Sequence, residues 1–218
     1  ASSFEKYIHR YGVVPDTTPV IFTNNSSTIS LLKSLISLGH IPAAYIDARD
    51  ENEIEKDLLN CLEKNKIPFF NGAEVEGCDG NKKVQHVSIR YNKNKIFKMK
   101  CSMLCVSGGI NPDIHLFTQS KGLVKWDEKL LTFKPDTPFQ KTITLGSVSG
   151  NYDYEKTNEE INNKLSFLSE KNEEIKIEIN DINHFKIKEL WETKNERKSN
   201  WSKSFIDLHN DVTTKDLK

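Results

Sequence analysis

The sequence lacks an excess of charge of either sign. Its 218 residues include 31 Lys and Arg and 31 Asp and Glu, which leaves no formal net charge at pH 7. A protein without a strong positive field has no long-range attraction to nucleic acid or to an anionic membrane surface. We therefore expect neither nucleic acid nor membrane among its partners.

Long apolar runs and targeting signals are missing as well. No stretch approaches the about 18 consecutive apolar residues that a transmembrane helix requires. The first residues contain neither the basic region nor the apolar region of a signal peptide. Together these absences predict a soluble, cytoplasmic protein.

Motifs for common catalytic chemistry are equally scarce. The four cysteines, Cys61, Cys78, Cys101 and Cys105, show no Cys-x-x-Cys spacing, and the six histidines are scattered. Free cysteines are usually buried, so we interpret the four as core thiols rather than as a redox pair or metal ligands. Neither a G-x-S-x-G nucleophile elbow nor an H-E-x-x-H zinc motif occurs. We assign no catalytic residue and no metal ligand.

What the sequence does contain is apolar runs that alternate with helical periodicities. Residues 19–22 form a short apolar run that ends in a polar turn, and apolar residues then recur at helical spacing. A second apolar run covers residues 41–47, and an acidic helix start follows at residue 50. This order predicts a β-α-β-α unit. We expect Val20 and Tyr45 to lie on neighbouring parallel strands.

The following segment indicates an antiparallel excursion. Residues 67–70 predict a third strand, and residues 77–80 predict a turn. Residues 87–91 and 97–101 alternate between apolar and polar side chains, as half-buried strands do. The run at 103–106 is continuously apolar, which is typical of a buried parallel strand. The fold class predicted is therefore α/β, with a Rossmann-like domain that contains an antiparallel excursion.

The turn after the first strand is a candidate nucleotide site. Dinucleotide folds carry G-x-G-x-x-G there, because glycine permits the tight turn and the close approach of the pyrophosphate. Thr23, Asn25 and Thr28 occupy the three glycine places. Asn24 and Asn25 tolerate left-handed backbone. Ser26 or Ser27 is placed to cap the helix and to donate to a phosphate.

Two charged residues extend this candidate site. Asp47 lies 24 residues after Thr23, close to the spacing of the acid that binds the adenosine ribose, and Arg49 is an alternative contact for a phosphate. Side chains in the glycine places, however, put bulk in the path of the pyrophosphate. The alternative, which we favour, is a turn that has lost its ligand and serves packing between domains or subunits.

A second glycine-rich turn follows the buried strand. Residues 107–112 read SGGINP, and they stand at the carboxyl end of a strand, where open α/β sheets collect ligands and domain contacts. Residues 142–146 predict one more short strand, which ends at Gly146 and enters the segment 147–150.

The C-terminal third carries little recognisable chemistry. Thr157 and Glu160 have the spacing of a capping box ahead of a helix with Ile161 on its apolar face. Residues 170–200 are rich in Lys, Glu and Asn and predict a solvated helix followed by an extended connection. Both ends of the sequence look cut, because it begins inside a predicted helix and stops where another begins. We therefore expect a piece of a larger subunit.

Taken in chain order, several of these segments resemble the alpha subunits of heterotetrameric sarcosine oxidases. The resemblance covers nearly the whole chain and weakens between residues 150 and 200. In that family the Thr-Asn-Asn turn replaces the usual glycines. The segments that carry the resemblance are YIHRYGVVP at 7–15, VIFTNN at 20–25, IDAR at 46–49, VSGGINPDIHL at 106–116, WDE at 126–128 and FIDLHNDVT at 205–213.

The resemblance implies a domain plan of the pyridine nucleotide-disulfide oxidoreductase type. Residues 17–135 form an inserted, NAD(P)-binding-like dinucleotide-fold domain. Residues 1–16 end the preceding framework domain, and residues 136–218 return to it and lead toward an aminomethyltransferase domain. In this plan the segments that rejoin the framework face its nucleotide through Gly108, Gly109, Asn111 and Gly146.

The resemblance also implies an activity, cofactors and partners. The whole enzyme demethylates sarcosine oxidatively to glycine, forms hydrogen peroxide and passes the methyl carbon to tetrahydrofolate. NAD lies on the alpha subunit, FMN at its interface with the beta subunit, FAD on the beta subunit and zinc on a small subunit; the beta, gamma and delta subunits are the partners. Most of this equipment lies outside the chain, so we expect no sarcosine turnover by the isolated polypeptide.

Two other functions stay open. One is an NAD(P)H-dependent disulfide-reductase-like flavoprotein, which would need a redox cysteine pair and intact glycines. The other is a non-catalytic dinucleotide-fold module that buttresses flavin-bearing subunits in an amine or opine dehydrogenase complex. Related opine oxidases, cyanide synthases and proline dehydrogenases carry cluster-binding cysteines near residues 205–213, where this sequence has none. This departure argues against an iron-sulfur cluster.

Overall fold

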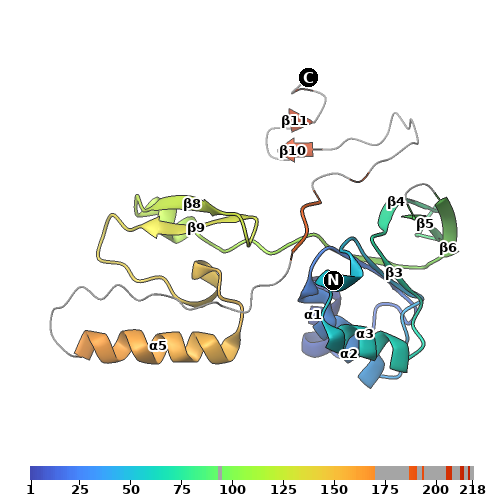
Figure 1. The fold of residues 1–218 in the computed structure, drawn as a ribbon, viewed down its shortest axis with the longest axis horizontal. Coiled ribbons are helices and arrows are strands. Elements are labelled where there is room, and N and C mark those ends of the chain that lie inside the picture. Colours follow the sequence, from blue (N-terminus) through green and yellow to red (C-terminus); the bar gives the residue numbers. More distant parts are fainter. Residues whose placement is uncertain are drawn as a thin grey trace. The chain divides into compact units, whose positions relative to one another are not determined.

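The structure is a computed structural model that describes residues 1–92, 95–169, 187–190, 193, 205–207, 212–213 and 216. The chain divides into two units (Figure 1). The first comprises residues 1–24, 28–107 and 188–218, and the second residues 25–27 and 108–187. The domain boundaries expected from the sequence, after residues 16 and 135, stay predictions.

A four-stranded parallel sheet forms the centre of the first unit. Its strands are β1 (Val20–Thr23), β2 (Ala44–Asp47), β3 (Phe69–Asn71) and β7 (Leu104–Ser107), in the order β3-β2-β1-β7. Ile21 of β1 stands opposite Tyr45 of β2 and Cys105 of β7. The predicted parallel pairing of the first two strands is therefore confirmed.

Three helices supply the apolar side chains packed against one face of this sheet. They are α1 (Ser2–Tyr11), α2 (Ile29–Ser37) and α3 (Lys56–Lys64). Ile21 and Tyr45 belong to the same apolar cluster as these helices, which fits the alternation of side chains along a strand. The remaining buried members of the cluster are Phe4, Ile8, Leu31, Leu32, Leu35, Ile54, Leu58, Leu62, Ile67 and Cys105.

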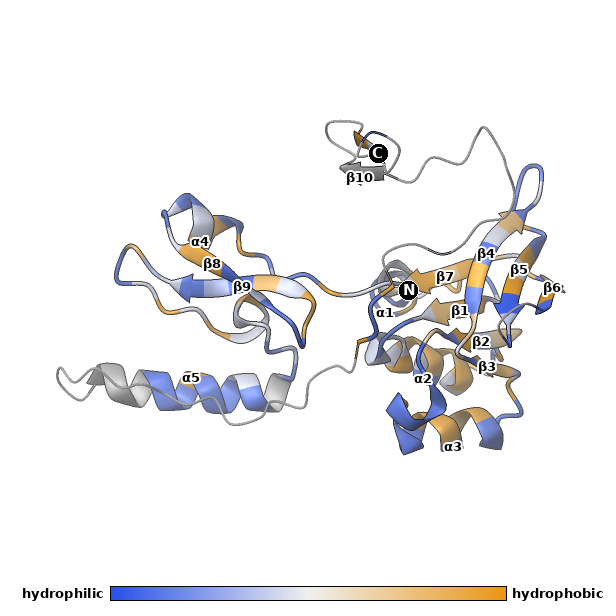
Figure 2. Cartoon of the chain, turned by 45° about the horizontal axis from the view of Figure 1, so that its top comes forward, coloured by the Kyte–Doolittle hydropathy of each residue, from blue (hydrophilic) through white to orange (hydrophobic). Residues whose placement is uncertain are grey.

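An antiparallel sheet packs against the other residues of the parallel strands. It contains β4 (Glu74–Asp79), β5 (His86–Tyr91) and β6 (Lys95–Lys100). Their apolar cluster takes in Val20, Phe22, Ala44 and Ile46 of the parallel sheet, together with Ala48, Ala73, Val75, Val87, Ile89 and Cys101. Strands β1 and β2 are thus buried on both faces, which explains their continuous apolar sequences. Figure 2 shows these strands and α2 largely in the hydrophobic colour.

The predicted α/β fold with an antiparallel excursion is confirmed by this arrangement, and one turn within it is corrected. Residues 77–80 do not form the expected turn, because Gly77 lies inside β4 opposite Ser88. The register shifts between Val75 and Gly77. Glycine in a strand commonly marks such an irregularity, and the chain reverses only after Asp79.

The second unit contains an antiparallel hairpin that the sequence did not reveal. Strand β8 (Leu123–Asp127) pairs with β9 (Thr132–Thr137), and the short helix α4 (His115–Gln119) precedes them. The strand predicted at 142–146 is wrong. Those residues lead into a 3-10 turn, Gly146–Ser149, and Gly146 has a positive φ of 61° that ends any extended run.

The capping box predicted at Thr157 is also wrong, because α5 (Tyr154–Ser169) begins three residues earlier. The Thr157 hydroxyl donates 2.6 Å to the carbonyl oxygen of Asp153 one turn back. Glu160 instead accepts the N–H of Gly146 at 3.2 Å and pairs with Lys164 at 2.8 Å. The Glu160 carboxylate, which we predicted at a helix start, therefore joins the 3-10 turn to α5 by a hydrogen bond.

Near the C-terminus, β10 (Phe205–Asp207) pairs antiparallel with β11 (Val212–Thr213). The extended connection predicted within 170–200 lies almost wholly outside the described residues. Among the helices that the structure describes, none combines the length and the apolarity needed to cross a membrane.

Packing of α2 against the sheet generates a stability prediction. Leu35 is fully buried, so Leu35→Ala should lower the free energy of unfolding by about 2–5 kcal/mol through lost burial and a residual cavity. Leu38 at the end of the same helix is 48% exposed, and Leu38→Ala should change it by about 0.5 kcal/mol or less. Urea unfolding followed by circular dichroism measures both. Equal losses in the two variants would contradict the packing described.

Candidate functional site

The turn after β1 is closed by its own side chains. Thr23, Asn24 and Asn25 are only 1–2% exposed, and Thr28 is 0% exposed. Ser26 begins a 3-10 turn, Ser26–Thr28, and Thr28 occupies the position before α2, so neither Ser26 nor its neighbour stands at the helix cap. A turn that binds a pyrophosphate presents bare backbone N–H groups to it. Here side chains fill the places where glycine would leave room.

Asn24 is bonded in two directions to Lys188. The Asn24 carbonyl oxygen accepts the N–H of Lys188 at 3.0 Å, and the Asn24 side-chain amide donates to the Lys188 carbonyl oxygen at 2.7 Å. The Lys188 ammonium group reaches past β1 and donates to the carbonyl oxygen of Ala48 at 2.8 Å. Main chain from residue 188 therefore lies at the carboxyl ends of β1 and β2, where dinucleotide folds place their ligand.

Asp47 does not present a free carboxylate, because Arg49 occupies both of its oxygens. The Arg49 Nη2 lies 2.8 Å from Oδ2, and Nε lies 3.1 Å from Oδ1 and 3.3 Å from Oδ2. The backbone N–H of Arg49 also donates to Oδ1 at 2.9 Å. The two side chains are 0% and 1% exposed. Such a bidentate, buried geometry is the strongest form of ion pair in proteins.

Burial and charge act against each other in this pair. Burial raises the pKa of the Asp47 carboxyl above its ordinary value, and the hydrogen bonds and positive charge of Arg49 oppose that rise. For Arg49, burial works to lower the pKa, but the bonds and charge of Asp47 outweigh it and raise the pKa. The carboxylate thus depends on Arg49 to stay ionised in the core.

Neighbouring elements hold the pair in place. Arg49 Nη1 lies 3.6 Å from a carboxylate oxygen of Glu55. The Arg49 carbonyl oxygen accepts the N–H of Gly72 at 2.8 Å, and the Asp47 carbonyl oxygen accepts the N–H of Ala73 at 3.2 Å. The end of β2 is therefore tied to the segment before α3 and to the connection between β3 and β4.

Thr28, at the third glycine place, has a structural partner. Its hydroxyl lies 2.6 Å from the hydroxyl of Tyr45, and both groups are buried. Burial raises the pKa of Tyr45 strongly, so the phenol stays protonated at neutral pH. The bond satisfies two buried polar groups that would otherwise be costly, and it joins the start of α2 to β2.

The second predicted set of site residues, Gly108, Gly109, Asn111 and Gly146, lies in the other unit. The Asn111 side-chain oxygen accepts the Thr132 hydroxyl at 3.1 Å. A Cβ at Gly109 would come within 3.3 Å of the Ile187 side chain, and one at Gly146 within 3.0 Å of Thr157. Three of the four thus have packing or bonding roles within the unit. Gly108 alone would meet no described atom within 4 Å of an added Cβ.

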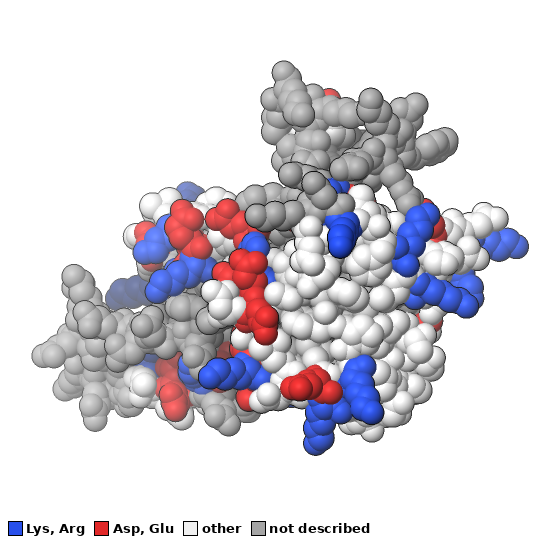
Figure 3. All heavy atoms as spheres, turned by 45° about the vertical axis from the view of Figure 1, so that its right-hand side comes forward, with Lys and Arg blue, Asp and Glu red and all other residues white. Residues whose placement is uncertain are grey.

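The charges on one face of the molecule do not form a patch of a single sign. In the view of Figure 3, basic and acidic side chains are interspersed, and neither sign covers that face as a continuous patch. No group of three His, Cys, Asp or Glu side chains that could hold a metal ion occurs among the residues described.

The cysteines are free thiols in unequal environments. Cys101 and Cys105 are buried, as expected from the sequence, whereas Cys61 is partly buried and Cys78 is exposed. Burial raises the pKa of Cys105 to about 11. Because the thiolate is the reactive form, Cys105 is almost entirely in its unreactive thiol form at neutral pH.

Lys188 is the residue of this region that the sequence did not single out. It lies 164 residues after Asn24 and 140 after Ala48, to which it bonds. No local spacing rule connects residues so far apart. In the described segment 187–190, the apolar Ile187 and Leu190 flank the charged Lys188 and Glu189, a pattern too short to predict an ordered segment.

Thiol reactivity tests the burial of the cysteines. With iodoacetamide at pH 8, Cys78 should be alkylated well before Cys101 and Cys105, because the latter are buried and Cys105 lacks thiolate. Peptide mass spectrometry over time measures the order, and labelling in urea is the control in which the differences should vanish. Labelling of Cys105 as fast as Cys78 in the native protein would count against this core.

The buried pair gives a sharper prediction. Arg49→Ala leaves the Asp47 carboxyl unpaired in the core and should lower the free energy of unfolding by about 3–5 kcal/mol. The control is Lys98→Ala, which removes a surface pair with Asp79 whose side chains are 57% and 32% exposed and should cost at most about 1 kcal/mol. Chemical unfolding of both variants measures the difference. Similar losses would show that Arg49 is not confined as described.

Comparison with known proteins gives distant similarities. No protein-family model matches the chain. Sarcosine oxidase subunit alpha of Rhizobium meliloti (strain 1021) is 26% identical over 133 residues, which cover 61% of this chain and 13% of that protein. The protein of the same name from Corynebacterium sp. (strain U-96) is 25% identical over 157 residues, which cover 69% of this chain and 16% of that protein. The chain thus spans about a seventh of the length of these relatives.

Solved structures that resemble part of this chain include two reductases. Bacillithiol disulfide reductase Bdr from Staphylococcus aureus has a TM-score of 0.48 at 15% identity and covers 63% of this chain and 44% of its own. Thioredoxin reductase from T. acidophilum has a TM-score of 0.48 at 17% identity and covers 64% and 47%. The parallel order β3-β2-β1-β7, with helices and an antiparallel sheet packed on it, makes the chain an α/β protein, and it has a distant sequence similarity to proteins named sarcosine oxidase subunit alpha.

Proposed function

We propose that this chain is the dinucleotide-fold portion of a sarcosine oxidase-like alpha subunit, and that it serves there as a structural module rather than as a nucleotide site. One observation carries the proposal: the groups expected to bind a nucleotide are already bonded to other residues of this chain. Asp47 is bonded to Arg49, and Asn24 is bonded to Lys188.

The fit of a dinucleotide to this turn is poor in each of its three contacts. The pyrophosphate would meet the buried side chains of Thr23 and Asn25, where glycine is needed. The ribose hydroxyls would have to displace Arg49 from Asp47, which would leave a buried guanidinium unpaired at a high cost. The main chain of Lys188 already uses the Asn24 carbonyl. The residues present therefore do not fit NAD.

Similarity to the relatives supports the wider assignment. The matches to proteins named sarcosine oxidase subunit alpha extend over 61–70% of this chain. Both the Thr-Asn-Asn turn and the SGGINP turn fall within segments that resemble that family, and the parallel order β3-β2-β1-β7 is what its expected fold requires. A module that positions neighbouring domains accounts for both the retained fold and the closed turn.

The oxidation itself is assigned to other parts of the assembly. In this proposal sarcosine is demethylated by the complete multi-subunit enzyme, with flavins and a functional nucleotide site held outside the residues described. The role of this chain is to place Gly108 and the segments around it beside those parts. No catalytic residue is assigned to it.

Addition of NAD or NADP to the purified chain tests the proposal. Neither nucleotide should raise the thermal midpoint at millimolar concentration, because a ligand stabilises only the state that binds it. The variant Asn25→Gly, which restores the second glycine, should also fail to bind, because Asp47 remains engaged.

The unaltered chain and the Asn25→Gly variant together separate the possible causes of a negative result. Binding by Asn25→Gly alone would mean that glycine loss, not the ion pair, closes the turn. A saturable stabilisation of the unaltered chain by NAD would overturn the structural role outright.

A further inference from the structure

A hollow lies at the amino ends of the parallel strands, whereas the closed turn lies at their carboxyl ends. It has a volume of about 560 Å³ and is lined by Thr18, Lys83, Val84, Gln85, His86, Lys100, Cys101 and Ser102. Thr18 precedes β1 and Ser102 precedes β7, so the hollow sits where these strands begin. Ligand sites of open α/β sheets usually lie at the other, carboxyl ends. This cavity is therefore independent of the dinucleotide turn.

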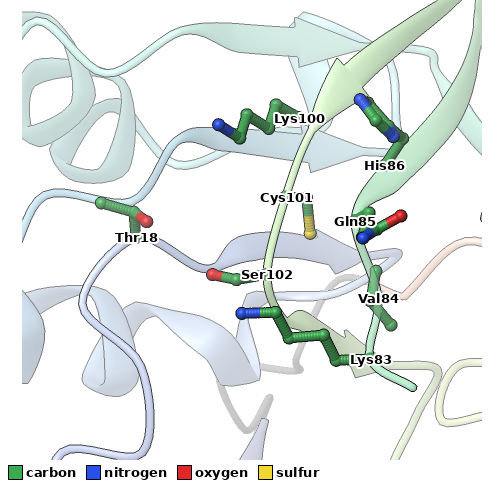
Figure 4. Close-up of a pocket in the computed structure, with 8 residues that line it drawn as sticks. All are labelled: Thr18, Lys83, Val84, Gln85, His86, Lys100, Cys101 and Ser102. Carbon is green, nitrogen blue, oxygen red and sulfur yellow. The ribbon is translucent and has the colours of Figure 1, made fainter. Parts of the chain in front are cut away.

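The polar groups around the hollow are mostly cations and hydrogen-bond donors. Lys83 and Lys100 bring two ammonium groups, and His86 stands directly opposite Lys100 in the register of β5 and β6. In Figure 4 the side chains of Lys100, Thr18, Ser102 and Lys83 lie on one side of Cys101, and His86 lies on the other. Val84 and Cys101 add a small apolar surface between them.

The nearby carboxylates are already engaged elsewhere. Asp16 accepts the N–H of Thr18 at 2.9 Å with one oxygen and the hydroxyl of Ser102 at 2.7 Å with the other. Asp79 pairs with Lys98 at 2.7 Å. Within the described part of the chain, neither Lys83 nor Lys100 has a carboxylate partner. The two lysines thus line the hollow without an ion pair of their own, and the Asp16 carboxylate at its wall is held by Thr18 and Ser102.

The walls of the hollow are fixed before any ligand arrives. The Gln85 carbonyl oxygen accepts the N–H of Cys101 at 2.9 Å, and the N–H of Gln85 donates to the backbone carbonyl oxygen of Asp79 at 2.8 Å. Gly80 approaches Lys83 so closely that an added Cβ would lie 1.9 Å from the Lys83 carbonyl oxygen. The Thr18 and Ser102 side is held by Asp16. A preformed cavity loses little entropy when it binds.

We propose that this hollow is a binding site for a small anionic molecule that carries carboxylate or phosphate groups. Its volume lies in the range of small-molecule sites, about 300–1,000 Å³. Two ammonium groups and the Thr18 hydroxyl match the oxygens of such groups, whereas the Ser102 hydroxyl already donates to Asp16. The short apolar surface suits a small carbon skeleton between them.

Titration of the ¹⁵N-labelled full chain with inorganic phosphate and, separately, with succinate tests the site. At least one of the two should give saturable shifts of backbone amides confined to residues 83–86 and 100–102. Saturation by phosphate alone identifies phosphate groups as the ligand chemistry, and saturation by succinate alone identifies carboxylates. No saturable shift with either probe at millimolar concentration would overturn the proposal.

Single lysine variants locate the binding. Lys83→Ala and Lys100→Ala should each weaken the binding constant by about tenfold, the usual scale for a charge-assisted hydrogen bond. Lys82→Ala is the matched control, because Lys82 is exposed and adjacent but does not line the hollow, and it should leave binding unchanged. Both lining lysines are exposed, so folding should survive, as the thermal midpoint will show. Equal weakening in all three variants would mean nonspecific charge attraction and would overturn the site.

Discussion

The buried ion pair between Asp47 and Arg49 is the constraint on which the candidate site depends. It places two opposite charges, each almost inaccessible to water, at the end of β2. Separating them would leave a charge unpaired in the core, which costs far more than any surface contact. The pair therefore fixes the end of the strand, and with it the connections to Glu55, Gly72 and Ala73.

This constraint belongs to an α/β sheet whose first turn is filled by the protein's own side chains. The sheet is buried on both faces, by helices on one and by an antiparallel sheet on the other, so the fold does not need a ligand for its stability. Where a nucleotide would contribute bonds, the chain contributes its own, from Arg49, Lys188 and the Tyr45–Thr28 hydroxyl pair. These bonds are the basis of the proposed role as a structural module.

Much of the first unit was predictable. Burial on both faces accounts for the apolar runs of β1 and β2, and packing of one face accounts for the helical spacing of α2. The hairpin of β8 and β9 was not predictable, since its strands are partly exposed and carry exposed Leu123 and Phe133. Residues 142–146 look like a strand but have no strand partner among the described residues. The position of Asp47 in the sequence matched that of a ribose-binding acid. Sequence spacing does not reveal that the Arg49 side chain, two residues later, donates to the Asp47 carboxylate.

The most direct test of the closed turn observes the Arg49 guanidinium itself. In a proton–nitrogen spectrum of the folded chain, the Arg49 Nε–H should give a sharp signal that exchanges slowly with water, because it is buried and bonded to Asp47. Addition of NAD should leave that signal in place. A rapidly exchanging Nε–H, or one that shifts in a saturable way with NAD, would contradict the account.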